Sequence, residues 1–123
     1  MNSFQENILI TSKGSFPIQN KILKIVTVDS GIIVLFDSNN INNDDGLYIS
    51  NLCLYSEYGE HKWDAELPKE MPYAIYEPEP YENIYSPHED PYLKKDEISA
   101  SSFRWYCILD IVTGKIKEMH VNK

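Results

Sequence analysis

Apolar and β-branched residues along the first part of the chain follow the pattern of strands. Residues 22–28 (ILKIVTV) are rich in β-branched side chains, and the continuous apolar run 32–36 (IIVLF) is short enough for a strand that is buried on both faces. The sequence Asp29-Ser30-Gly31 between them supplies a tight turn. We therefore predict that these two runs form the central hairpin of a sheet.

Alternation of apolar and polar positions predicts two further hairpins. Residues 47–55 return to strand chemistry, and across a short turn residues 61–67 alternate between apolar and charged side chains. Residues 103–111 alternate in the same way, and a glycine-containing turn leads to a last strand over 116–121. Helical periodicity is weak, and only residues 93–101 suit two helical turns.

The composition changes between these hairpins. Six of the seven prolines fall within residues 68–91. From Glu66 to Glu97 there are nine acidic residues and three lysines, so this stretch carries −6 of the net charge of −8. Proline lacks a backbone donor and interrupts the hydrogen-bond ladders of a sheet. We therefore expect a long irregular loop over residues 68–100, with tyrosines that pack it onto the sheet.

Together these patterns predict a single all-β domain, mainly antiparallel, over residues 1–123. We expect about six to eight strands in one curved sheet or a small barrel or sandwich, with the long loop across one side. A chain of 123 residues is long enough to bury a core without a disulfide. The side chains expected in that core are Phe36, Leu54, Trp63, Phe103, Trp105 and Leu109.

The net charge of −8 limits the classes of partner. An acidic chain is repelled by nucleic-acid phosphates and by anionic membrane surfaces, whereas it attracts cationic proteins. No apolar run is long enough to span a bilayer, and no secretory signal opens the sequence. Cys53 and Cys107 form no metal-binding pair and are expected as buried free thiols. We predict a cytoplasmic protein that binds neither nucleic acid nor membranes, with its oligomeric state left open.

Motifs for catalysis or metal binding are weak. The chain has no glycine-rich phosphate loop and no nucleophile elbow. His61, His88 and His120 stand in different segments without the spacing of metal ligands. Asp64 and Glu66 share one face of a predicted strand, as an acid–base pair would, but alternating charge on a solvated face explains them equally well. We therefore expect no enzyme, no metal and no other cofactor.

The acidic segment rich in tyrosine and proline is the strongest candidate for a functional surface. Carboxylates interleaved with tyrosines suit a basic protein partner, because the acids steer and pair with lysine and arginine while the rings anchor the contact. A solubilising loop whose tyrosines cover a sheet edge would have the same composition. The candidate partner-binding residues are Tyr76, Glu77, Glu79, Tyr81, Glu82, Tyr85, Glu89 and Asp90.

In size, charge and composition the chain resembles the small acidic immunity proteins that accompany bacterial toxins with basic nuclease domains. This resemblance implies an inhibitor whose acidic and tyrosine side chains cover the cationic, phosphate-binding cleft of a cognate toxin. The alternative is a β domain that binds a small ligand or peptide in a groove lined by tryptophan and tyrosine, and loss of binding on substitution of Trp63 or Trp105 would favour it. A third hypothesis is a hydrolase that uses Asp64 and Glu66.

Overall fold

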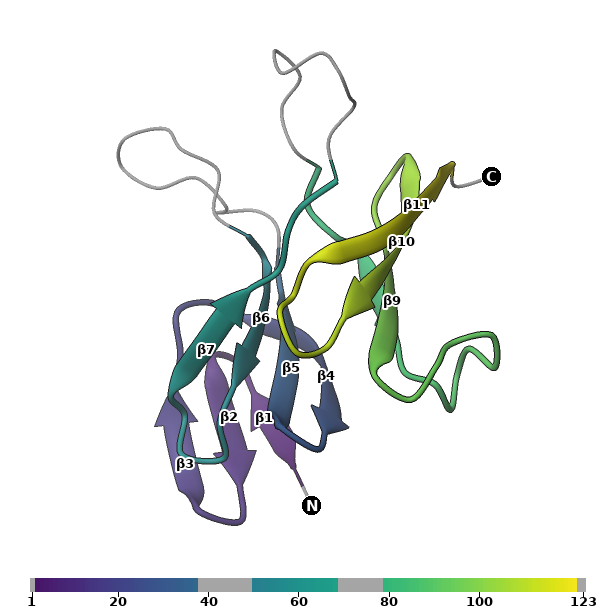
Figure 1. The fold of residues 1–123 in the computed structure, drawn as a ribbon. Coiled ribbons are helices and arrows are strands. Elements are labelled where there is room, and N and C mark those ends of the chain that lie inside the picture. The colour runs from purple at the N-terminus through teal and green to yellow at the C-terminus, as the bar shows by residue number, and fades with distance from the viewer. Residues whose placement is uncertain (1, 38–49, 69–78, 122–123) are drawn as a thin grey trace.

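The computed structural model describes residues 2–37, 50–68 and 79–121, and within them the chain forms eleven strands and no helix (Figure 1). All strand pairs are antiparallel, which confirms the predicted all-β class. The strands form three open sheets, one of three strands and two of four. The expectations of a single curved sheet and of a closed barrel, with six to eight strands, are therefore wrong.

The N-terminal sheet has the order β1-β2-β3 and precedes the predicted central hairpin. Each strand pairs with the next across a short turn, so this sheet is a simple meander. Its strands are β1 (Ser3–Gln5), β2 (Ile8–Thr11) and β3 (Gly14–Pro17).

The predicted central hairpin is confirmed in the second sheet, which has the order β4-β5-β6-β7. Gly31 in its turn has φ 150°, and a Cβ there would lie 2.2 Å from the carbonyl oxygen of Tyr55. Glycine is therefore the residue that fits this close approach of two backbones. The strands are β4 (Ile22–Val28), β5 (Gly31–Phe36), β6 (Leu52–Tyr55) and β7 (His61–Asp64).

The third sheet has the order β11-β10-β9-β8 and corrects two expectations. The predicted irregular loop 68–100 contains two strands, and the segment suggested as helical turns ends in one of them. β9 lies between β8 and β10 and pairs with both, so long-range pairing overrides its weak local preference. The strands are β8 (Asn83–Tyr85), β9 (Glu97–Ser101), β10 (Trp105–Asp110) and β11 (Ile116–Val121).

The second sheet is the middle layer, with a hydrophobic cluster on each face. Alternate residues of β5 point to opposite sides, so that Ile33 and Leu35 face the third sheet while Ile32 and Val34 face the N-terminal strands. All six residues of β5 are buried, as expected for a continuous apolar run. The fold therefore requires both neighbouring sheets to cover this strand.

The predicted core is right for Phe36, Leu54 and Leu109, which are buried, and partly right for the two tryptophans, which are partly buried. It is wrong for Phe103, which is 79% exposed. The Ser102 amide donates to the Trp105 carbonyl oxygen at 2.8 Å and closes a turn that contains Phe103. The strand starts only at Trp105, so Phe103 is outside the alternation that places side chains in the core.

Cys53 and Cys107 are free and buried, as predicted. They belong to different hydrophobic clusters, on opposite faces of the middle sheet. Among the described residues there is no helix of the length and apolarity that a membrane crossing needs.

Candidate functional site

The described part of the acidic segment, residues 79–97, is attached to the third sheet by its carboxylates. Glu79 accepts hydrogen bonds from the Ser102 hydroxyl at 2.8 Å and the Arg104 amide at 2.9 Å, and it forms an ion pair with the Arg104 guanidinium. Burial by itself raises the pKa of Glu79, but these hydrogen bonds outweigh burial and lower the pKa. Glu79 therefore holds the start of the segment against the β9–β10 turn.

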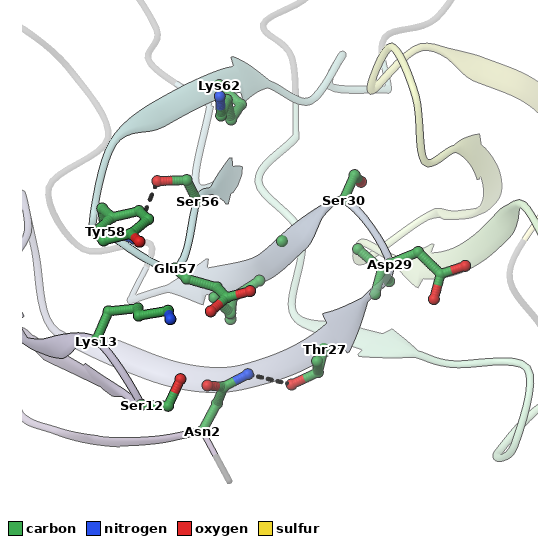
Figure 2. Close-up of a pocket in the computed structure, with 13 residues that line it drawn as sticks. Asn2, Ser12, Lys13, Thr27, Asp29, Ser30, Ser56, Glu57, Tyr58 and Lys62 are labelled. Atoms are coloured by element: carbon green, nitrogen blue, oxygen red, sulfur yellow. Dashed lines mark hydrogen bonds between the residues drawn. The ribbon is translucent and has the colours of Figure 1, made fainter.

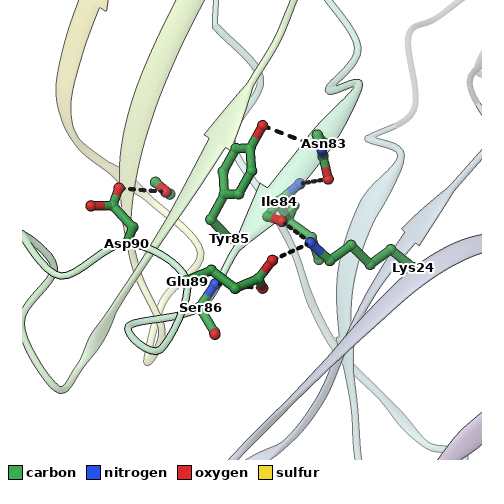
Figure 3. Close-up of polar contacts among 8 residues, drawn as sticks. Lys24, Asn83, Ile84, Tyr85, Ser86, Glu89 and Asp90 are labelled. Carbon is green, nitrogen blue, oxygen red and sulfur yellow. Dashed lines mark hydrogen bonds and ion pairs between the residues drawn. The ribbon is translucent and has the colours of Figure 1, made fainter.

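Lys24 of β4 joins the acidic segment to the middle sheet, as Figure 3 shows. Its ammonium group donates to the Ile84 carbonyl oxygen at 2.6 Å, pairs with the Glu89 carboxylate at 2.9 Å and lies 5.2 Å from the centre of the Tyr85 ring. The hydrogen bond from Lys24 lowers the pKa of Glu89. One cation thus fixes three groups of the segment at once.

Asp90 lies on the face of the third sheet that is turned away from the core. Its carboxylate accepts hydrogen bonds from the Tyr106 hydroxyl and from the Ser99 hydroxyl, the latter at 3.2 Å. The hydrogen bond from Tyr106 lowers the pKa of Asp90. Burial, and next the bond to Asp90, raises the pKa of the Tyr106 phenol. Asp90 therefore serves to position the segment on the sheet.

Glu97 at the start of β9 is a buried carboxylate with its own cation. It pairs with the Lys117 ammonium at 2.7 Å and accepts a hydrogen bond from the Lys94 amide at 2.9 Å. The hydrogen bond from Lys117 lowers the pKa of Glu97. Together with Glu79, Glu89 and Asp90, four carboxylates of the segment are thus engaged inside the chain.

Tyr81 lies in the core, which corrects its predicted place at a partner-binding surface. Its side chain is 1% exposed, and its hydroxyl donates to the Glu66 carbonyl oxygen at 2.6 Å. The Tyr81 amide donates to the Asn51 side-chain oxygen at 3.0 Å. Burial raises the pKa of the Tyr81 phenol well above its usual value. Tyr81 anchors the segment to the domain and is not available to a partner.

One end of the third sheet carries two exposed apolar side chains and an exposed carboxylate. Phe103, in the β9–β10 turn, is 79% exposed, and Val121, at the end of β11, is 67% exposed. Val121 pairs with Trp105, directly after that turn, and the Glu82 amide donates to the Ser101 carbonyl oxygen at 2.7 Å, directly before it. We call Glu82, Phe103 and Val121 the tip surface; Figure 1 shows this end of β9, β10 and β11 near the C-terminus.

The tip surface overlaps the predicted partner-binding set only at Glu82, which is exposed and has no side-chain partner among the described residues. Tyr76 and Glu77 lie outside the described residues. Phe103 escaped prediction because it was assigned to the core, and Val121 was predicted only as the end of the last strand. The sequence did contain an indication that Phe103 lies in a turn, because the serine residues directly before it favour a turn between two strands.

An apolar hollow of about 760 Å³ lies where the β4–β5 turn meets residues 86–88, 95–96 and 111–112. This volume is within the range of small-ligand sites. Its lining contains no tryptophan or tyrosine, and Trp63 instead donates its indole N–H to the Ile111 carbonyl oxygen at 3.0 Å. The hollow is therefore not the predicted aromatic groove. Its principal lining residues are Val26, Val28, Asp29, His88, Lys95, Asp96, Ile111 and Val112.

A second hollow of about 480 Å³ is polar and lies between the β4–β5 and β6–β7 turns (Figure 2). The Asn2 side-chain amide donates to the Thr27 hydroxyl at 2.8 Å on its rim. Lysine and carboxylate side chains both line it, including Lys13, Lys62 and Glu57. Because its lining carries charges of both signs, this hollow favours neither an anionic nor a cationic ligand.

Asp64 and Glu66, the carboxylates of the third hypothesis, have separate partners. Glu66 accepts a hydrogen bond from the Ile116 amide at 2.9 Å, whereas Asp64 bonds to His61 Nε2 at 2.8 Å and accepts one from Cys53 Sγ at 3.1 Å. Both carboxylates are exposed, and neither lines the two hollows. Among the described residues, neither hollow gives these two carboxylates the shared cleft that the third hypothesis needs.

Fold and site thus define an antiparallel three-sheet domain with an acidic segment bound along its third sheet. The chain belongs to a family described as Domain of unknown function (DUF7957), whose sequence model matches residues 1–121. No curated protein and no solved structure matches the chain. Since the family match includes every described residue, the three sheets and the acidic segment belong to one family domain.

Proposed function

We propose that this protein binds a partner protein with a basic surface and inhibits it, in the manner of an immunity protein. The observation that carries the proposal is the tip surface, where Phe103 is 79% exposed and Glu82 is an exposed carboxylate without a side-chain partner among the described residues. Exposed aromatic side chains supply much of the free energy of protein interfaces, and a carboxylate at their rim favours a cationic partner.

The net charge of −8 supports the same class of partner. Long-range attraction depends on the summed charge of the molecule, and internal ion pairs such as Lys24–Glu89 leave that sum unchanged. Direct contact, by contrast, needs side chains without internal partners. We therefore assign steering to the whole acidic surface and contact to the tip surface, with Tyr76 and Glu77 as further candidates.

Inhibition follows from occlusion. A nuclease toxin approaches nucleic-acid phosphates through clustered lysine and arginine side chains. In the proposed complex Phe103 enters the apolar part of the cleft, and Glu82 faces its cations. The cleft is then closed to an anionic substrate without any chemical step by the inhibitor.

The test is capture of a partner by the immobilised full chain from a lysate of its own cell, at about 0.05 and about 0.5 M salt, between which screening removes most exposed charge attraction. We expect one basic protein, held less well at high salt. Phe103→Ala should reduce its capture at least tenfold. Tyr58→Ala, which removes an exposed ring from the β6–β7 turn of another sheet, is the matched control and should capture as the wild type does.

The captured protein is then mixed with purified inhibitor and assayed for nuclease activity. Inhibition by the wild type and by Tyr58→Ala, but not by Phe103→Ala, supports the proposal. Equal capture by the wild type and Phe103→Ala removes the tip surface from it, and binding that strengthens with salt removes the electrostatic part.

A second candidate function is binding of a small apolar ligand in the hollow of about 760 Å³. The observation in its favour is the aliphatic lining, which includes Val26, Val28 and Ile111, with charged groups at the rim. An environment-sensitive apolar dye should bind there, and Val112→Asp at the exposed edge should reduce its fluorescence. The same variant leaves the tip surface intact, so the two functions are separable.

A further inference from the structure

Three side chains that are separated in the sequence meet on one face of the β6–β7 hairpin. Cys53 lies directly opposite Asp64, and Tyr55 lies opposite His61. Cys53 and Tyr55 are two residues apart on β6, so they share a face of the sheet. Their partners Asp64 and His61 are therefore brought to that same face.

A bulge makes this possible. In a regular strand, residues three apart such as His61 and Asp64 would point to opposite faces. The register between β6 and β7 shifts between Leu54 and Tyr55, so that Lys62 is left as the extra residue of β7. The extra residue returns His61 to the face of Asp64. No spacing rule applied to the sequence reveals this convergence.

We propose that Cys53, His61 and Asp64 form a binding site for one divalent transition-metal ion of the zinc class. One donor atom from each side chain lies within 4.8 Å of the other two. Asp64 Oδ1 is 3.1 Å from Cys53 Sγ and 2.8 Å from His61 Nε2. The site is independent of the proposed tip surface, which lies on the third sheet.

The donor set has the chemistry that zinc selects. Thiolate, imidazole and carboxylate are its usual ligands, at about 2.3, 2.0 and 2.1 Å from the ion. Two such ligands of a tetrahedral ion are about 3.3–3.6 Å apart, as those bond lengths require. The distances from Asp64 Oδ1 to Cys53 Sγ and to His61 Nε2 must each lengthen by about half an ångström to admit the ion. Rotation of the exposed His61 and Asp64 side chains supplies that movement.

Burial differs among the three ligands in a way that suits metal entry. Cys53, on β6, is fully buried, whereas His61 and Asp64, on the edge strand β7, are exposed. An ion arriving from solvent meets imidazole and carboxylate first and the sulfur last. The fourth position of a tetrahedral ion then faces water, as in sites with three protein ligands.

The metal-free arrangement already has a proton where the ion would lie. The Cys53 thiol donates a hydrogen bond to Asp64 Oδ1 at 3.1 Å. Binding of the ion replaces this proton, which passes to the buffer, and neutralises a thiolate and a carboxylate together.

The experiment titrates the reduced full chain with Co²⁺, a spectroscopic substitute for zinc, and then displaces it with Zn²⁺. We expect one ion per chain, visible bands of tetrahedral cobalt and a near-ultraviolet thiolate-to-cobalt band. Cys53→Ser should abolish the thiolate band. Loss of a second-shell partner already weakens metal binding about 10–100-fold, so His61→Gln and Asp64→Asn should weaken it at least tenfold.

His120→Gln is the matched control, because His120 is also exposed and also lies near a carboxylate, 3.7 Å from Glu118. It should bind Co²⁺ and Zn²⁺ as the wild type does. His61→Gln and Asp64→Asn alter exposed side chains and are expected to fold, which circular dichroism checks. A wild-type spectrum without a thiolate band, or equal affinity of the wild type and His61→Gln, overturns the proposal.

Discussion

The acidic segment and the β6–β7 hairpin use carboxylates in opposite ways. In the segment, Glu79 and Glu89 each meet a cation, and their hydrogen bonds lower their pKa values. In the hairpin, Asp64 meets a buried thiol and an imidazole instead. The first arrangement uses ion pairs and hydrogen bonds to fix the segment to the sheets. In the second, the proposed metal ion would replace the proton of the Cys53 thiol. What lies opposite a carboxylate thus decides whether it stabilises the fold or offers a site.

The largest expected effect is at the buried anchor of the acidic segment. Tyr81→Ala should lower the free energy of unfolding by about 3–5 kcal/mol, because it removes a fully buried aromatic ring. Phe103→Ala, its exposed counterpart, should change it by less than about 0.5 kcal/mol. Urea unfolding measures both. Similar losses in the two variants would mean that the segment is not anchored through Tyr81.

The next effect is the acid sensitivity of the segment. The pKa values of Glu79, Glu89, Asp90 and Glu97 are lowered in the folded protein. A carboxylate with a depressed pKa stabilises the fold above its unfolded value and loses this contribution as pH falls through its folded value. The free energy of unfolding should therefore decrease from about pH 5 downwards.

Unfolding by urea at a series of pH values tests this sign. Glu79→Gln should flatten the decrease, because one of the four linked protons is removed. Glu82→Gln is the control, since Glu82 has no side-chain partner among the described residues, and its profile should follow the wild type. A profile of Glu79→Gln that is as steep as the wild type would contradict the role of the ion pair with Arg104.

A smaller effect is expected where the segment meets the middle sheet. Lys24→Met should cost about 1 kcal/mol, since it removes one hydrogen bond to a carbonyl and a half-exposed ion pair. Hydrogen exchange of the Tyr85 and Glu89 amides should become faster. Lys62→Met, on the bulge of the β6–β7 hairpin, should leave both measurements near those of the wild type.

The smallest effect is expected at the β6–β7 hairpin when metal is removed. With a chelator present, His61→Gln should change the free energy of unfolding by less than about 0.5 kcal/mol, because its side chain is exposed. With Zn²⁺ present, the melting temperature of the wild type should rise and that of His61→Gln should stay. A large loss in the chelated protein would show that the three side chains serve the fold.

Local pattern was enough to predict the β4–β5, β6–β7 and β10–β11 hairpins, but it did not predict the N-terminal sheet of β1, β2 and β3. The apolar run of β5 and the alternation of β10 are set by neighbouring residues, and glycine-containing turns separate the strands. In the third sheet only β10 and β11 were predicted. β9 forms a strand because it pairs with β8 and β10, which lie on either side of it. Its serine and alanine residues have little preference of their own.

The candidate site was harder to predict than the fold. Tyr81 is buried although composition assigned it to an exposed polar loop, and Phe103 is exposed although alternation assigned it to a core-facing strand position. Burial of an aromatic residue near a strand end depends on where the strand starts and on what covers it. Neither is encoded within a few residues.

By itself the sequence determined the all-β class, the central hairpin, the two buried free cysteines and the net charge of −8. These depend on side-chain periodicity, turn residues and composition, which are properties of the chain alone. The tertiary structure decided which carboxylates meet cations, that Phe103 is exposed, and that Cys53, His61 and Asp64 converge. The reason is register: a one-residue shift between strands reverses the face to which a side chain points, and distant strands set that register.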